Sequence, residues 1–143
     1  MSRIDAGLLV VRVGIGLMFL LVHGGPKLLG GPGVWAQVGA AMQHVGIGFA
    51  PTFWGFLAAL AEGVGGLCLI LGLFTRPAAA SMAMTMAVAA TMHLAQGDGL
   101  GVASHAVEAG IVFLGLAITG PGAYSVQAAM QPPREPGGYT LPS

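Results

Sequence analysis

The sequence predicts an all-α fold: a transmembrane four-helix bundle with a short interfacial helix in the first outer loop. Hydrophobic residues make up 55% of the 143 residues and charged residues only 7%, far below the roughly 25% that is usual for soluble domains. A helix needs about 20 apolar residues to cross a bilayer. Four stretches approach this length, at residues 6–29, 53–74, 77–94 and 102–119. Residues 1–122 are therefore predicted to form a single transmembrane domain.

The first stretch follows Arg3 and could be a cleavable signal peptide. However, Arg12 interrupts its apolar run, no A-x-A cleavage site follows it, and three more hydrophobic stretches come later. We therefore expect the stretch to be retained as a membrane helix. The glycine- and proline-rich residues 30–33 should end it.

The long connection at residues 30–52 contains a second helical pattern. Apolar residues recur at positions 34, 38, 41, 42 and 45, which is the spacing of one helix face. Trp35 suits the membrane interface, so the pattern predicts a short helix lying on the outer membrane surface. A partly ordered glycine-rich loop is the alternative.

Small residues recur at four-residue spacing in the second and third stretches, where they allow close helix packing in lipid. They are Gly55, Ala59 and Gly63 in the second stretch, and Ala79, Ala83, Ala87 and Thr91 in the third. The connections after the second and third stretches are very short. Successive helices should therefore be antiparallel neighbours in a tight bundle.

Basic residues near the ends of the stretches predict the orientation. Arg3, Arg12, Arg76 and Arg134 fall on one side, and Lys27 alone falls on the other. The positive-inside rule then places both termini in the cytoplasm, with the protein as a multi-pass component of the inner (cytoplasmic) membrane. Beyond residue 122 the composition predicts a short interfacial segment at residues 124–130 and a flexible cytoplasmic tail, which together make up residues 123–143.

Charge, cysteine content and motifs limit the partners and cofactors. The formal net charge of zero gives no basic surface for nucleic acid. Cys68 is the only cysteine, so thiol exchange within the chain is excluded. No haem, flavin or iron–sulfur motif is present, and any redox role would require a partner subunit. The expected partners are the lipid bilayer and either another protein or further copies of this chain.

Glu62 is the most informative polar residue in the apolar stretches. A carboxylate near mid-depth needs a cation, strong hydrogen-bond donors or a proton. Counting along antiparallel helices makes Arg12, from below, and His23, from above, its candidate partners. Glu62 is either a buried polar bridge that fixes helix register or a catalytic group that accepts and donates protons. Arg12 and Arg76 are interpreted as structural ion-pair residues, with Arg76 also anchoring the inner interface.

The remaining polar residues are predicted to form a ligand-binding cluster at the outer ends of the helices. They are His23, Lys27, His93, His105 and Glu108. No H-x-x-x-H pair is present, and a metal site is not predicted. A pocket for a quinone head group is favoured over a metal, because quinone carbonyls accept hydrogen bonds from His or Lys beside an apolar tail channel. Lys27 has the alternative of reaching the outer head groups.

Four quoted stretches carry a family resemblance: VRVGIGLMFLLVHGGPKLLGGPG, LAALAEGVGGLCLILGLFTRPAA, HLAQGDG and HAVEAGIVFLGLAITGPGAYSVQA. From about Leu9 to Ala129 the chain resembles the DoxX family of small four-helix membrane proteins. The residues that carry the resemblance are Arg12, His23, Gly24, Lys27, Glu62, Gly66, Gly72, Arg76, His93, Glu108, Gly120 and Gly122.

The resemblance implies quinone-linked redox work. The family name comes from subunits linked to a thiosulfate:quinone oxidoreductase, and members are described as oxidoreductases or as membrane partners of redox and oxidative-stress proteins. In one hypothesis the chain is the membrane subunit of such an oxidoreductase: His23 and Lys27 bind the quinone carbonyls and Glu62 transfers the proton. In the alternative it is a non-catalytic accessory or scaffold subunit that docks a larger complex. A carrier or channel is disfavoured, because the chain is short and lacks inverted repeats.

Overall fold

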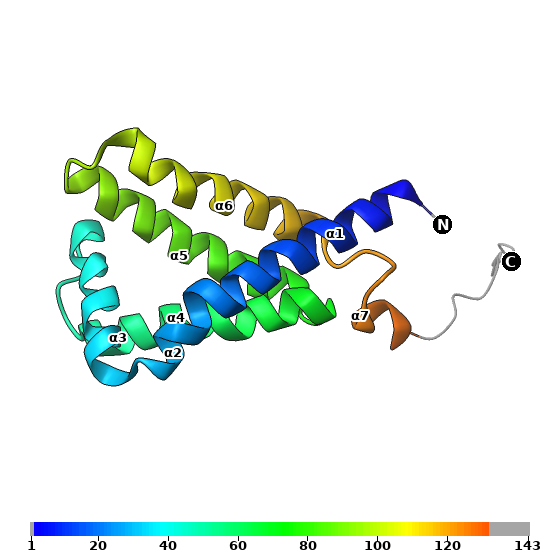
Figure 1. Ribbon diagram of the computed structural model, residues 1–143, viewed down its shortest axis with the longest axis horizontal. Coiled ribbons are helices and arrows are strands. Elements are labelled where there is room, and N and C mark those ends of the chain that lie inside the picture. Colours follow the sequence, from blue (N-terminus) through cyan, green and yellow to red (C-terminus); the bar gives the residue numbers. More distant parts are fainter. Residues whose placement is uncertain (1, 132–143) are drawn as a thin grey trace, which may run out of the picture.

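The computed structural model describes residues 2–131, and this part of the chain is entirely helical apart from turns and short connections. The first long segment is continuous from α1 (Arg3–Met18) through the π-helical η1 (Phe19–Gly24) to α2 (Gly25–Leu29), and the other three are α4 (Pro51–Leu71), α5 (Thr75–Ala95) and α6 (Gly99–Thr119). The shorter elements are α3 (Gly31–Gly39), the 3₁₀-helical η2 (Ala40–Val45) and α7 (Val126–Ala129) (Figure 1). Residues 132–143, which hold Arg134 and most of the predicted tail, lie outside the described residues.

All four long segments are long and apolar enough to cross a membrane, which confirms the predicted fold class. Both ends of each segment lie within a few residues of the bounds predicted from the sequence. Large apolar side chains project outward along them, where lipid is the favourable environment. Examples are Val10, Leu21, Val64, Ile111, Leu114 and Ile118.

The helices follow one another around the bundle. α5 packs between α4 and α6, and α1 packs on α4. The ring of Phe19 meets the ring of Phe113 edge-on, with centroids 4.8 Å apart, and this contact joins the first segment to α6. Gly72 ends α4 in the left-handed conformation (φ 67°), which a residue without a side chain adopts readily.

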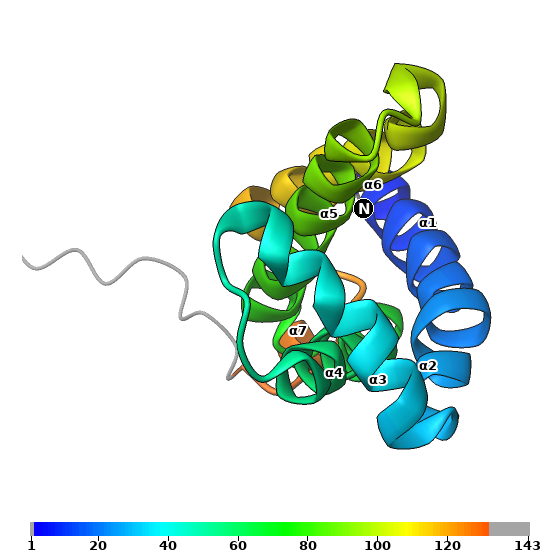
Figure 2. The same ribbon diagram turned by 90° about the vertical axis from the view of Figure 1, so that its left-hand side faces the viewer.

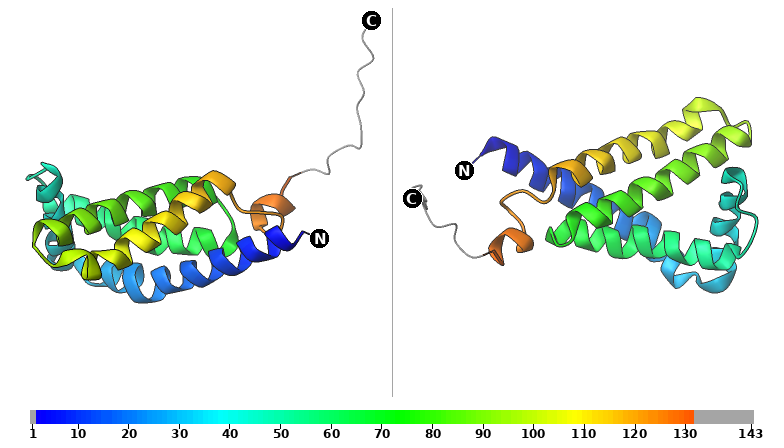
Figure 3. Two further views of the ribbon diagram at one scale, coloured as in Figure 1. Left: turned by 90° about the horizontal axis from the view of Figure 1, so that it is seen from above. Right: turned by 180° about the vertical axis from the view of Figure 1, so that it is seen from behind.

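The bundle is not uniformly tight, contrary to the sequence prediction. α4 and α5 meet at their connecting turn, near α7, and diverge toward the opposite end, near α3 (Figures 1 and 3). We call these the α7 end and the α3 end. At the α3 end, α3 packs on α4 and α2, and η2 packs on α5 and α4, so the pair lies across the opening of the bundle (Figure 2).

The predicted short helix in the first long connection is therefore present, but it is part of the bundle wall. A Cβ atom on Gly39 would collide with the Pro51 carbonyl oxygen, and one on Gly55 would collide with the Trp35 carbonyl oxygen. The absence of both side chains allows α3 to contact α4 backbone to backbone. Trp35 donates a hydrogen bond of 2.8 Å from Nε1 to the Lys27 carbonyl oxygen, which ties α3 to α2.

Candidate functional site

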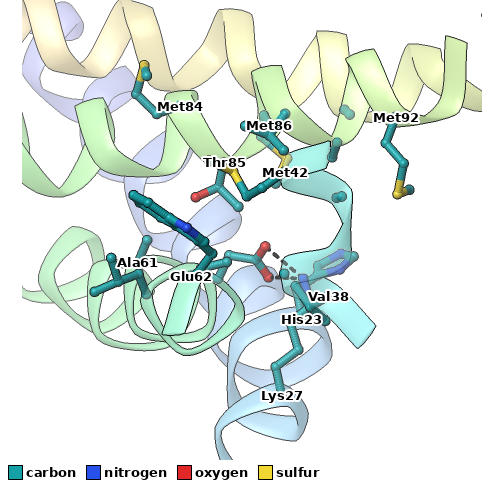
Figure 4. A pocket seen from close by; sticks show the side chains of 18 of the residues that line it. His23, Lys27, Val38, Met42, Ala61, Glu62, Met84, Thr85, Met86 and Met92 are labelled. Carbon is teal, nitrogen blue, oxygen red and sulfur yellow. Dashed lines mark hydrogen bonds and ion pairs between the residues drawn. The ribbon is translucent and has the colours of Figure 1, made fainter. Parts of the chain in front are cut away.

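A cavity of about 730 Å³ occupies the space where α4 and α5 diverge. Its walls come from the first segment, α3, η2, α4, α5 and α6, and most of the lining side chains are apolar. Figure 4 shows Glu62 of α4 pointing into this space, with Thr85, Met84 and Met86 of α5 on the facing wall. A volume of this size is typical of sites for small molecules.

Glu62 and Lys27 form an ion pair in the cavity wall. Lys27 Nζ donates to both carboxylate oxygens of Glu62, at 2.7 Å and 2.6 Å (Figure 4). Glu62 is 1% exposed and Lys27 27% exposed. The pair brings no net charge into the apolar bundle, which removes the main penalty of placing a carboxylate there.

The partner of Glu62 is therefore Lys27, and the predicted partners Arg12 and His23 were wrong. The reason lies in the direction of side chains on a helix, which tilt toward its N-terminus. Lys27 consequently reaches back from the α3 end into the bundle, and Glu62, on the antiparallel α4, tilts toward the α3 end. Arg12 also tilts toward the α7 end, which takes it away from Glu62. His23 tilts in the same direction as Lys27, but its ring packs beside those of Phe19 and His105.

Two glycines allow the first segment to come close enough for this pair. A Cβ atom on Gly24 would collide with the Gly63 backbone nitrogen, and one on Gly16 would lie 2.8 Å from the Gly66 carbonyl oxygen. Backbone contact at these points brings Lys27, less than one turn beyond Gly24, to the face of α4 that carries Glu62.

The π-helical turn η1 contributes the aromatic rings of Phe19 and His23 to the cavity wall. The Gly25 N–H donates to the Leu20 carbonyl, five residues earlier. Pro26 favours this widened turn, because it has no N–H to donate and its ring would crowd the carbonyl four residues before it. The helix thus widens into a π turn before Pro26 and continues as one segment into α2.

His23 lies in this turn, one helical turn before Lys27, and also lines the cavity. Its ring centroid is 4.9 Å from that of Phe19 and 5.5 Å from that of His105 on α6. Three helical segments therefore place the imidazoles of His23 and His105 and the Glu62–Lys27 pair around one cavity.

Of the other members of the predicted cluster, one lies at the cavity and one does not. His93 lines the cavity, and its Nδ1 lies 2.7 Å from Asp98 Oδ2 in the α5–α6 turn. Glu108 is exposed on α6 and is not among the lining residues. Within residues 2–131, no group of three or more His, Cys, Asp or Glu side chains is arranged to hold a metal ion.

Arg12 and Arg76 lie at the α7 end, away from the cavity. Arg12 is buried and donates to the backbone carbonyls of Pro121 and of Tyr124, the latter at 2.6 Å. It therefore joins α1 to the connection after α6 through carbonyl acceptors, and none of its bonds within the described part of the chain goes to a carboxylate. Arg76 is exposed and lies beside Gly120.

Several polar residues at or beside the cavity were missed in the sequence, among them Trp54, Thr85 and Asp98. Trp54 lines the cavity from α4 and has a buried Nε1 with no hydrogen-bond partner among the described residues. Asp98 pairs with His93, and Thr85 faces the cavity from α5. The five-residue spacing of His93 and Asp98 across a Gly-containing turn was a usable signal. Nothing in the sequence distinguishes Trp54 from an ordinary interfacial tryptophan.

Fold and site together define a class: a multi-pass four-helix membrane protein with a charge-balanced polar pair in a mostly apolar cavity. Residues 7–94 match the model of the DoxX family. The chain belongs to the DoxX family. No curated protein and no solved structure matches it.

Proposed function

We propose that this protein is the membrane subunit of a quinone-linked redox complex and that its cavity holds the quinone head group. The observation that supports the proposal most directly is the Glu62–Lys27 pair in the wall of an apolar cavity of about 730 Å³, beside His23. An apolar cavity with a few convergent polar groups suits a neutral ring that carries two oxygen acceptors.

Each polar residue would have a defined role. A lysine ammonium has three N–H donors, and two of those of Lys27 are directed at Glu62, which leaves one for a quinone carbonyl. His23 would donate to a quinone oxygen in the same way. Reduction of a quinone to a quinol takes two electrons and two protons. Lys27 would give a proton to a quinone oxygen and Glu62 would relay a replacement proton from solvent to Lys27, while a partner subunit with a redox cofactor would supply the electrons.

The orientation is part of the proposal. The positive-inside rule favours termini in the cytoplasm of a cell whose inner membrane holds the protein. The cavity and the α3 end would then lie in the outer half of the membrane, and the Arg12 and Arg76 region at the cytoplasmic side.

The first test is purification of the whole chain in mild detergent, followed by solvent extraction and an oxidised-minus-reduced ultraviolet spectrum. We expect a quinone to accompany the wild-type protein. A preparation that neither retains a quinone nor binds an added short-chain ubiquinone would contradict the proposal.

The second test compares two identical substitutions in the complex with its redox partner. Glu62→Gln should leave a folded protein whose quinone-dependent turnover falls by about 100-fold or more, the range for loss of a general acid or base. Glu108→Gln is the matched control, because Glu108 is exposed and outside the cavity. Unchanged turnover in Glu62→Gln would favour the accessory-subunit alternative.

A further inference from the structure

Trp54 presents an unsatisfied hydrogen-bond donor at the cavity. Its indole Nε1 is buried and has no partner among the described residues, although the side chain lines the cavity. Buried N–H groups in proteins are nearly always bonded, and an exception calls for a missing acceptor. Trp35, the other tryptophan, donates to a backbone carbonyl within the protein. The two tryptophans therefore differ, and the one without a hydrogen-bond partner for its N–H is the one that lines the cavity.

The charged side chains in the cavity lining indicate which kind of hydrogen-bond acceptor suits the Trp54 N–H. Among the described residues that line the cavity, Lys27 and Glu62 are the only Lys, Arg, Asp or Glu side chains, and they neutralise each other. A phosphate or carboxylate head group would find no unpaired cation there and would be costly to bury. The cavity is thus suited to an uncharged oxygen acceptor.

The lining of the cavity also includes exposed apolar side chains on two neighbouring helices. Leu57 of α4 and Met84 of α5 both line it, yet they are 39% and 69% exposed. A lateral mouth between α4 and α5 would pass between these two side chains. At the α3 end, Val38, Gly39 and Met42 of α3 and η2 form the wall, and the glycine contacts of α3 with α4 hold that wall in place.

We propose that Trp54 is a ligand-binding residue whose indole N–H donates to an oxygen of an uncharged, tailed isoprenoid quinone that enters laterally between α4 and α5. This inference rests on the proposed function and adds the entrance route and one specific contact. The head group lies against Trp54 and the polar wall, while the apolar tail leaves past Leu57 and Met84 into the bilayer.

The contact is tested by titrating the full chain in lipid nanodiscs with decylubiquinone. Trp54→Phe keeps the aromatic ring and removes the N–H, and the Kd should rise about fivefold, the typical effect of one hydrogen bond. Its thermal stability without ligand should not fall, because an unsatisfied donor has been removed. Trp35→Phe is the matched control and should show the reverse: lower stability and unchanged Kd. An unchanged Kd in Trp54→Phe, with quinone still bound by the wild type, overturns the inference and leaves the proposed function intact.

The route is tested with a bulky side chain at the mouth. Met84→Trp should slow the binding of decylubiquinone, and it should leave the binding of ubiquinone-0, which has no tail, unchanged. Ile111→Trp, on the outward face of α6 and outside the lining residues, is the control and should bind both quinones like the wild type.

Equal binding rates in Met84→Trp and the wild type overturn the lateral route, and displacement of the quinone by phosphatidylglycerol at equal concentration overturns the uncharged-ligand assignment. No binding of either quinone by the wild type would remove the proposed function together with this inference.

Discussion

At the scale of single residues, Lys27 has the central structural role, because it neutralises a carboxylate that is almost entirely buried. Both Glu62 oxygens accept hydrogen bonds from the same ammonium. Removal of one partner from a buried pair leaves an uncompensated charge, whereas removal of both leaves none. The two partners are not equivalent, since Lys27 is 27% exposed and Glu62 only 1%.

The resulting prediction concerns three variants. Lys27→Met should lower the free energy of unfolding by about 3 kcal/mol, the effect of leaving one member of a buried ion pair alone. Glu62→Gln should have a smaller effect, because the partly exposed Lys27 still meets an amide oxygen. The double variant Lys27→Met/Glu62→Gln should recover most of the loss. Thermal unfolding in one detergent, followed by tryptophan fluorescence, provides the comparison. A double variant less stable than Lys27→Met would show that the pair does not stabilise the bundle through charge compensation.

At the scale of helices, glycines set the distance between the first segment and α4. Gly24 meets the backbone of Gly63, and Gly16 meets that of Gly66. In contrast, Gly7 and Gly14 on the same segment face open space. The two kinds of glycine are indistinguishable by type in the sequence, and only their neighbours separate them.

Substitution by alanine should therefore have opposite effects at these positions. Gly24→Ala places a methyl group in the Gly63 backbone and should destabilise the protein by about 1–3 kcal/mol, as overpacking does. It should also push Lys27 away from Glu62. Gly14→Ala should be neutral or stabilising by up to about 1 kcal/mol, since alanine favours helix. The melting temperatures of the two variants are compared with that of the wild type. Equal shifts would mean that the close contact of η1 with α4 is not required for stability.

At the scale of the whole molecule, an even number of candidate spans predicts that residues 2 and 131 lie on the same side of the membrane. The α3 end carries the cavity and the Glu62–Lys27 pair, while the α7 end is closed by bonds of Arg12 and by the Asp5 carboxylate, which accepts from the Ala123 N–H at 2.9 Å. The ends thus differ in character: one contains a cavity, and the other is closed by side-chain hydrogen bonds.

The orientation can be measured with reporter fusions. Alkaline phosphatase fused after Gln96, in the α5–α6 turn, should be active, and a fusion at the C-terminus should be inactive, because the positive-inside rule places the termini in the cytoplasm. A fluorescent protein that folds only in the cytoplasm should give the complementary pattern. Phosphatase activity at the C-terminus would reverse the orientation.

Much of the fold could be predicted from the sequence, and less of the site. Length and hydropathy locate four spans, because crossing a bilayer demands a run of apolar residues that is visible along the chain. Five residues that line the cavity could be singled out, because polar groups in apolar segments are conspicuous. They are His23, Lys27, Glu62, His93 and His105. The pairing of Glu62 was missed, since counting depth by residue number ignores the tilt of long side chains toward the helix N-terminus.

By itself, then, the sequence determined that this is a four-helix membrane protein with polar residues in its interior. Bilayer thickness fixes the length of each apolar run, and the desolvation cost keeps polar residues away from lipid, so both effects can be recognised from the order of residues along the chain. The tertiary structure decided which of those residues meet. Glycine contacts brought Lys27 to Glu62, the divergence of α4 and α5 opened a cavity, and α3 covered one end of it. These outcomes depend on backbone approach and side-chain direction between segments far apart in the chain, which no local pattern records.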